Sequence, residues 1–123
     1  MMRGVVHARN EAVVGLRLRG PEGVEADVDA IVDSGFTSSL TLPATILAAL
    51  GLSRQSGGNA VLADGTVRQF DIYAAELAWD GTWRTIAVSA IGNESLIGMR
   101  LLAGHKLVID VVPNGVVEIV PLP

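Results

Sequence analysis

The sequence predicts a small, mostly β domain that closes into a barrel-like single lobe with two short helices. Half of its 123 residues are hydrophobic but only 4% are aromatic, so the core must be aliphatic. The 14 glycines and the closely spaced valines favour strands joined by tight turns. Helical spacing interrupts this pattern only at residues 43–50 and 99–103. A chain of this length is expected to form one domain over residues 1–123, and a small barrel is its natural closure.

The first three strands are predicted from alternating apolar and polar residues. Strands at 5–9 and 12–19 flank a polar turn at residues 10–11, and a second turn at 20–23 precedes a strand at 24–32. Both faces of this third strand become apolar near its end, as expected for a central buried strand.

A short strand at 39–42 leads into the first helix, over residues 43–50. Pro43 suits the first helical turn and Gly51 ends the helix. The polar residues 55–59 are predicted to form a loop.

The second half of the chain is predicted to consist of hairpins and one further helix. Strands at 60–63 and 66–75 flank Asp64-Gly65, the strongest short-range hairpin signal. A second such turn lies at residues 80–81. Residues 96–98 lead into the helix at 99–103, and the last hairpin pairs strands at 107–112 and 116–120.

Composition argues against several classes of function. The net charge is −4 and the nine basic residues form no stripe, so nucleic acid is not an expected partner. No apolar run approaches the ~20 residues that span a bilayer, and the N-terminus lacks a secretory h-region. We therefore expect no membrane partner and a cytoplasmic location. The chain has no cysteine and only two histidines, His7 and His105, so no metal or cofactor is expected.

The most informative segment is residues 30–39, in which an apolar run delivers Asp33 into a Ser34-Gly35 turn. A carboxylate where a strand enters the core is costly unless it is used or paired. Gly35 tolerates unusual backbone angles and Ser34 supplies a hydroxyl donor. Because Asp, Ser and Gly are common in turns, the triplet alone more often indicates a structural turn.

Other candidate residues are better explained by structure. Asp64 and Asp80 each precede a glycine in a hairpin turn, and Asp110 lies in a strand context. Trp79 and Trp83 flank a turn and are expected to cover core or interface. A serine hydrolase is disfavoured because the chain contains no Gly-x-Ser-x-Gly nucleophile elbow.

The order of the motifs resembles that of the retropepsin-like aspartic proteases, the single-lobed group that includes the retroviral enzymes. Within that group the chain is most similar to the DTGF proteins of bacteria and archaea, in clan AA. The resemblance extends over about residues 12–120 and rests on five segments, namely 31–37, 40–52, 62–66, 78–81 and 96–110.

The resemblance implies a closed acid-protease barrel that works as a homodimer and hydrolyses extended peptides without a cofactor. Asp33 from each of two chains would share a proton and activate a water molecule. Two carboxylates a few ångströms apart cannot both ionise cheaply, so one serves as acid and the other as base.

The resemblance also implies supporting roles. The Ser34 hydroxyl would bond across the dimer, and Ile97 and Gly98 would pack behind the active-site loop, where only glycine leaves room. A flap would fold over the peptide and offer backbone hydrogen bonds, as an added strand does. The loop is completed by Gly35, Phe36 and Thr37, and the flap turn by Ala63, Asp64, Gly65 and Thr66.

The chain departs from the retroviral pattern at two linked positions. Met99 and Thr37 stand where retroviral members carry an arginine and its acidic partner, which implies a different brace. Arg100 stands where nearer relatives often have Asp. Two alternatives stay open beside the endopeptidase: a peptide-binding module on the same dimeric fold, and a purely structural dimer. The intact triplet that begins at Asp33 favours the endopeptidase.

Overall fold

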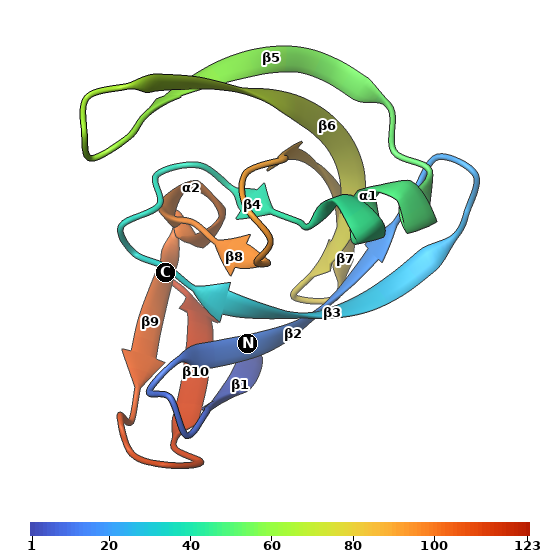
Figure 1. Cartoon of the computed structure of the whole chain (residues 1–123). Helices are drawn as coiled ribbons and strands as arrows, with labels where there is room; N and C mark the ends of the chain where they lie inside the picture. The colour runs from blue at the N-terminus through green and yellow to red at the C-terminus, as the bar shows by residue number, and fades with distance from the viewer.

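The computed structural model describes all residues from 1 to 123. It contains a ten-stranded sheet and two short helices (Figure 1). In chain order the elements are β1 (Met2–Val6), β2 (Ala12–Arg19), β3 (Glu25–Val32), β4 (Leu40–Thr41), α1 (Ala44–Leu50), β5 (Arg54–Val61), β6 (Val67–Trp79), β7 (Thr82–Ser89), β8 (Leu96–Ile97), α2 (Met99–Leu102), β9 (His105–Ile109) and β10 (Val116–Pro121).

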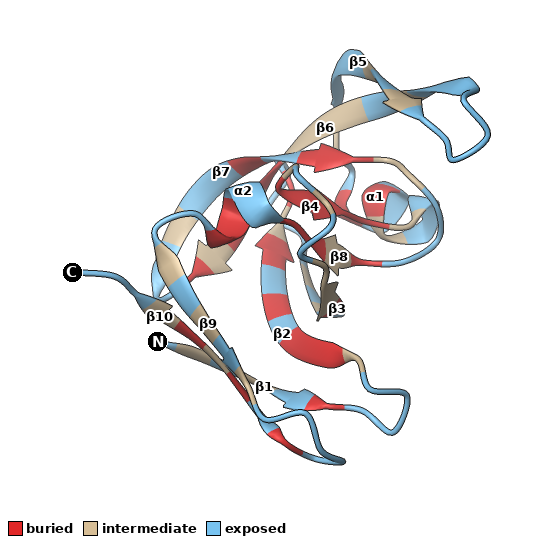
Figure 2. Ribbon diagram, turned by 90° about the vertical axis from the view of Figure 1, so that its left-hand side faces the viewer, coloured by how far each residue is buried: buried red, intermediate tan, exposed pale blue.

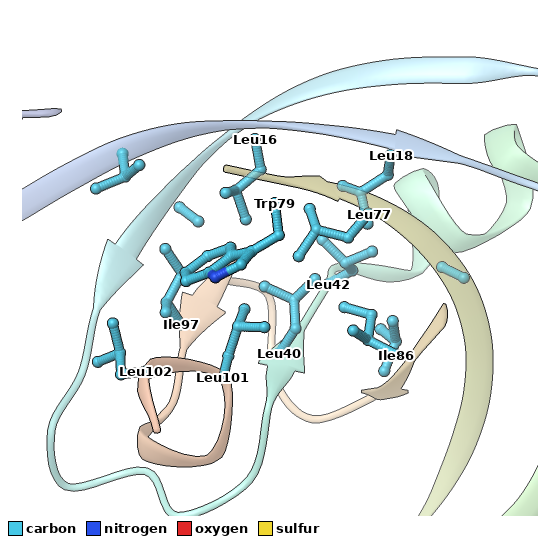
Figure 3. Close-up of a cluster of buried hydrophobic side chains, with 14 of the residues drawn as sticks. Leu16, Leu18, Leu40, Leu42, Leu77, Trp79, Ile86, Ile97, Leu101 and Leu102 are labelled. Carbon is cyan, nitrogen blue, oxygen red and sulfur yellow. The ribbon is translucent and has the colours of Figure 1, made fainter. Parts of the chain in front are cut away.

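The sheet closes on itself, which confirms the predicted mostly β barrel with two short helices. Its strand order is β5-β6-β7-β4-β8-β3-β2-β1-β10-β9, and an additional β6–β2 pairing joins the ends of the six central strands. Strand β5 lies outside this ring at one end, and β1, β10 and β9 extend it at the other. The barrel interior is aliphatic apart from Trp79, which lies among Leu16, Leu40 and Ile97 (Figure 3).

The alternation predicted for β2 is confirmed. Val14, Leu16 and Leu18 are buried in the barrel. Arg17 points outward, where its Nε donates to Asp27 Oδ1 of the neighbouring strand β3 at 2.9 Å. Apolar residues with a period of two therefore build this wall of the barrel.

Both predicted helices are present within one or two residues of their predicted limits. Pro43 precedes α1, and Gly51 ends it in the left-handed conformation at φ 63°. Helix α2 is a single turn that covers one end of the barrel (Figure 1). Neither helix is long and apolar enough to cross a membrane.

The limits predicted for the first strand are wrong. Strand β1 ends at Val6, and residues 7–11 form a turn in which the His7 amide donates to the Glu11 carbonyl at 2.9 Å. Asn10 adopts a positive φ of 61° in this turn, a conformation that asparagine tolerates. The chain reverses earlier than the apolar pattern suggests because turn geometry, and not hydrophobicity, sets the boundary.

The loop predicted at 55–59 is also wrong, since these residues belong to β5. They pair with β6 in an antiparallel hairpin that lies largely exposed above the barrel (Figure 2). A strand exposed on both faces can be polar without cost, because only its backbone pairing holds it in place. A Cβ at Gly58 would lie 2.6 Å from the ring of Phe70, which packs over this glycine from the opposite strand.

In the last hairpin the second strand, β10, lies within one residue of its predicted limits, but the first strand is displaced. Strand β9 ends at Ile109, and residues 110–112 belong to the turn and not to the strand. The Val112 amide donates to the Asp110 carbonyl at 2.9 Å, and Asn114 adopts a φ of 61°. Strand β9 therefore ends three residues before the predicted limit at residue 112.

Candidate active site

Asp33 lies directly after β3, at the position where this strand leaves the barrel. The Ile31 amide donates to the Ser95 carbonyl at 2.8 Å, and the Asp33 amide donates to the Ile97 carbonyl at 2.9 Å. These bonds continue the parallel pairing of β3 with β8. The main chain at Asp33 is therefore fixed to β8, while the side chain of Asp33 is only half-buried.

The turn after β3 holds the Asp33 carboxylate through one oxygen. The Gly35 amide donates to Asp33 Oδ1 at 3.0 Å, and the Phe36 amide donates to the Asp33 carbonyl at 3.1 Å. A Cβ at Gly35 would lie only 3.3 Å from Oδ1, so glycine suits this close turn. Within the chain Oδ2 accepts no hydrogen bond and no cation pairs with the carboxylate, which leaves that oxygen available for a proton or a water molecule.

The loop that follows is bound to the start of α2. The Gly98 amide donates to the Ser39 carbonyl at 2.9 Å, the Met99 amide to the Phe36 carbonyl at 2.8 Å, and the Arg100 amide to the Ser38 carbonyl at 3.2 Å. The structure therefore brings the predicted segments 33–37 and 97–98 together. They are 60 residues apart in the chain and meet through main-chain hydrogen bonds.

Gly98 lies where no side chain fits. A Cβ there would overlap the Ser38 carbonyl oxygen and lie 2.6 Å from the Phe36 ring. The close approach predicted for this glycine is thus present, with Phe36 as the side chain that fills the space.

Ser34 and Thr37 are exposed, and their hydroxyl groups make no hydrogen bond within the chain. A bond from Ser34 across a dimer therefore stays a prediction. Arg100 is likewise exposed on α2, and its side chain forms no ion pair. It contacts the loop through its main-chain amide, which donates to the Ser38 carbonyl.

The hairpin β5–β6 arches over α2 and β4 in the view of Figure 1, and in Figure 2 it projects from the top of the barrel. In its turn the Leu62 amide donates to the Thr66 carbonyl at 2.8 Å, and Gly65 has a φ of 85°. Asp64 Oδ1 accepts from the Thr66 amide at 2.9 Å and from the Thr66 hydroxyl at 2.6 Å. These bonds, the hydroxyl above all, lower the pKa of Asp64. Asp64 therefore has the turn role that its Asp-Gly context predicts.

No hydrogen bond joins the hairpin turn at 62–66 to the loop at 33–37. The hairpin is tied to the barrel further along, where the Ala90 amide donates to the Asp71 carbonyl at 2.9 Å. Residues 63–66 are thus not bonded to the loop that holds Asp33 in the single chain.

Sequence reasoning missed Thr41, which is 1% exposed and joins two strands behind the site. Its hydroxyl donates to the Glu94 carbonyl at 2.9 Å and accepts from the Leu96 amide at 3.0 Å. It thereby ties β4 to the start of β8, the strand that pairs with β3. A threonine between two leucines was the available signal, because a buried hydroxyl needs partners.

A cavity of about 270 Å³ lies between the hairpin and the segment after β7. Sequence reasoning missed it too, since it depends on the register of the hairpin. Its lining residues come from three segments of the chain: Ala60, Leu62, Arg68, Gln69, Phe70, Ala90, Ile91 and Gly92.

The remaining candidate residues from the sequence have structural roles. Trp79 is buried and donates from its indole Nε1 to His105 Nε2 at 3.3 Å. The Arg19 guanidinium lies 4.0 Å from the centre of the Trp83 ring, a cation–π contact. Asp80 occupies a tight turn at φ 50°. No three His, Cys, Asp or Glu side chains cluster so that they could hold a metal ion.

Comparison of the chain with protein-family models, with curated proteins and with solved structures finds no match.

Proposed function

We propose that this chain is an aspartic endopeptidase of the retropepsin-like type, active as a homodimer with one Asp33 from each chain. The observation that carries the proposal is the setting of that carboxylate. One of its oxygens accepts from the Gly35 amide and the other is free. The loop that presents it is bound to the Gly98–Arg100 segment by three main-chain hydrogen bonds. A fixed and half-buried carboxylate of this kind suits acid–base chemistry.

The proposed reaction uses two facing carboxylates that share one proton. The ionised Asp33 takes a proton from a water molecule, whose oxygen forms a bond to the peptide carbonyl carbon. The protonated Asp33 of the other chain gives its proton to the carbonyl oxygen. Collapse of the tetrahedral intermediate breaks the C–N bond. The first Asp33 gives the proton that it took from water to the leaving nitrogen, and the second Asp33 takes a proton back from a hydroxyl of the intermediate as the carboxylic acid product forms. Two carboxylates close together favour this shared-proton state, because both cannot ionise cheaply.

Two features support a homodimer: Asp33 has no second carboxylate beside it within the chain, and β9 is an edge strand of the sheet. No second carboxylate pairs with Asp33 within the chain, so the partner must come from another copy. Strand β9 is an unpaired edge, and such edges favour further strand pairing. Apolar side chains are exposed nearby, with Val5 and Val116 directly opposite each other and Val108 on β9. A two-fold axis would use the same surface on both chains.

The hairpin β5–β6 is proposed as the cover over an extended peptide. Strand β5 is an edge of the sheet, which leaves its backbone available to a peptide that lies along it as a further strand. In this role the turn residues Ala63, Asp64, Gly65 and Thr66 would face the substrate.

The decisive experiment digests a peptide library with the wild-type protein and with Asp33→Asn. The substitution keeps size but removes the acid–base group, so cleavage should fall by about 10²–10⁴-fold with the fold unchanged. A pepstatin-like inhibitor should have the same effect on the wild type. Asp29→Asn, which changes an exposed carboxylate on β3 outside the proposed site, is the matched control and should retain cleavage. Cleavage that survives Asp33→Asn would refute the mechanism, and a wild type that only binds peptides would favour the binding module.

The dimer is tested by mixing. Added in excess, the Asp33→Asn protein should exchange into heterodimers that hold one catalytic carboxylate, and so should suppress wild-type activity. Asp29→Asn protein, added in the same excess, is the active control for exchange and should leave the activity unchanged. Undiminished activity after demonstrated subunit exchange, or a stable monomer that cleaves peptides, would overturn the shared site.

A further inference from the structure

The cavity under the hairpin has one wall made by a single face of two paired strands. Ala60 lies opposite Arg68 in the β5–β6 register, and Gly58 lies opposite Phe70. Since side chains two apart share a face of a strand, Ala60, Arg68 and Phe70 project to the same side. The facing wall is formed by the segment that begins at Ala90.

The interior of this cavity is mostly apolar. Leu62, Phe70 and Ile91 supply its larger hydrophobic surfaces. Its volume of about 270 Å³ falls just below the range of roughly 300–1,000 Å³ typical of pockets for whole drug-sized ligands. The space therefore suits a side chain of a longer molecule that is held elsewhere.

Arg68 is the one charged residue that lines the cavity, and it is exposed. It forms no ion pair and no side-chain hydrogen bond within the chain. Arg54, on the same hairpin, is by contrast paired with Asp71 at 2.8 Å, and Arg17 is paired with Asp27. An unpaired guanidinium beside an apolar cavity is suited to a carboxylate on the molecule whose side chain fills that cavity.

The segment that forms the facing wall leads to the candidate active site. It runs from Ala90 to Ser95, and the Ser95 carbonyl accepts from the amide of Ile31, two residues before Asp33. This continuous segment connects the cavity to the candidate site. A peptide held along the hairpin can therefore be positioned by both.

We propose that this cavity selects substrates in which an apolar residue and an acidic residue are two positions apart. The apolar side chain enters between Phe70 and Ile91, and the carboxylate pairs with Arg68. The spacing follows because residues i and i+2 of an extended peptide share a face. The inference rests on the proposed function, since it names the substrate class of the same site.

The expected preference is modest and depends on salt. A pair at an exposed guanidinium should favour Asp or Glu over the neutral amide by about two- to fivefold in kcat/KM. The preference should shrink as ionic strength rises, because salt screens exposed charges.

The test digests a proteome-derived peptide library and sequences the new ends. Wild type should enrich Asp and Glu two positions from an enriched apolar residue. Arg68→Gln should remove the acidic enrichment and keep the apolar one, and Arg68→Glu should enrich Lys and Arg there instead. The matched control is Arg84→Gln, an exposed arginine on β7 that forms no ion pair and does not line the cavity. It should keep the wild-type pattern.

A second variant tests the cavity itself. Ile91→Phe narrows the space and should shift the apolar preference toward smaller residues, with the acidic preference kept. Cleavage without an acidic preference, or with one that Arg68→Gln leaves intact, overturns this inference while the proposed function stands.

A wild type that cleaves nothing overturns the proposed function, and the inference is then decided by binding. The same library is passed over immobilised Asp33→Asn protein and its Arg68→Gln variant. Retention of acidic peptides that depends on Arg68 supports the selection by charge. Equal retention by both proteins, or none by either, overturns it.

Discussion

The loop after β3 and the hairpin β5–β6 differ in how they are held. The loop is fixed by main-chain hydrogen bonds that join Asp33 to β8 and residues 36–39 to the start of α2. Gly98 packs so closely against the loop that a Cβ would not fit. The part of the hairpin before Ile72 is held by its own pairing and by a bond from Ala90 to Asp71, whereas β6 from Ile72 onward is paired with β7 in the barrel. Val61, at the end of β5, is 73% accessible.

Under the proposed function, this difference would divide the work between a rigid base that holds Asp33 and a compliant cover over the substrate. Segments with few buried contacts open at lower free energy than the strands of a packed barrel. A group that performs acid–base chemistry needs fixed geometry, whereas a cover must open to admit a peptide. Changes in the loop should therefore alter both stability and activity, and changes at the hairpin turn should act locally.

The largest effect on stability is expected from Gly98→Ala. The added methyl group would meet the Ser38 carbonyl and the Phe36 ring, so the loop at 33–37 must shift. Overpacking of this kind costs about 1–3 kcal/mol, and peptide cleavage should fall with it. Urea unfolding measures the loss.

Gly15→Ala is the matched control for that substitution, because a Cβ there would approach nothing closer than Asp29 Oδ1, at 3.8 Å. It should change stability by no more than about 0.5 kcal/mol. If Gly15→Ala lowers the free energy of unfolding as much as Gly98→Ala does, close packing around Gly98 is not what makes the loop rigid.

An intermediate effect is expected from Thr41→Val, which keeps the shape of the side chain. The change leaves the Glu94 carbonyl and the Leu96 amide without their hydroxyl partner. Loss of such buried bonds costs about 1–3 kcal/mol. The comparison variant is Thr85→Val on the exposed side of β7, which should be nearly neutral in the same urea titration. An unchanged midpoint for Thr41→Val would show that Thr41 does not tie β4 to β8.

The smallest effect is expected at the hairpin turn and depends on pH. The Thr66 hydroxyl and amide lower the pKa of Asp64, so the folded turn favours the carboxylate. This contribution is present above the pKa of Asp in the unfolded chain, about 3.9, and is lost as pH falls through the lowered folded pKa. The protection factors of the turn amides, which compare their hydrogen-exchange rates with the intrinsic rates at the same pH, should fall in that acidic window.

Thr66→Val removes the hydroxyl and keeps the amide, so the pKa of Asp64 should move upward toward its ordinary value. Carboxyl NMR titration measures the shift. The pKa of Asp27, lowered by its hydrogen bond to Arg17, serves as the internal reference and should not move. Global unfolding in urea near neutral pH should be unchanged, and a large loss there would contradict the view of the hairpin as a locally held cover.

Much of the fold was predictable because local rules and the tertiary fold agree. The alternation of Val14, Leu16 and Leu18 placed β2 correctly, the residues at 43–51 placed α1, and Asp64-Gly65 placed the hairpin turn. Local rules failed where turn geometry or backbone pairing decides, as at the His7 turn and along the polar strand β5.

The sequence by itself determined the presence of Asp33 at the end of an apolar strand and of a glycine turn after it. It also determined which residues fill the aliphatic core, because burial follows hydrophobicity at the period of each element. Only the tertiary structure decided that β3 pairs in parallel with β8, that Phe36 fills the space beside Gly98, and that Arg68 borders a cavity closed by Ile91. These contacts join segments tens of residues apart, and their register is set by the closing of the whole barrel, which no local pattern contains.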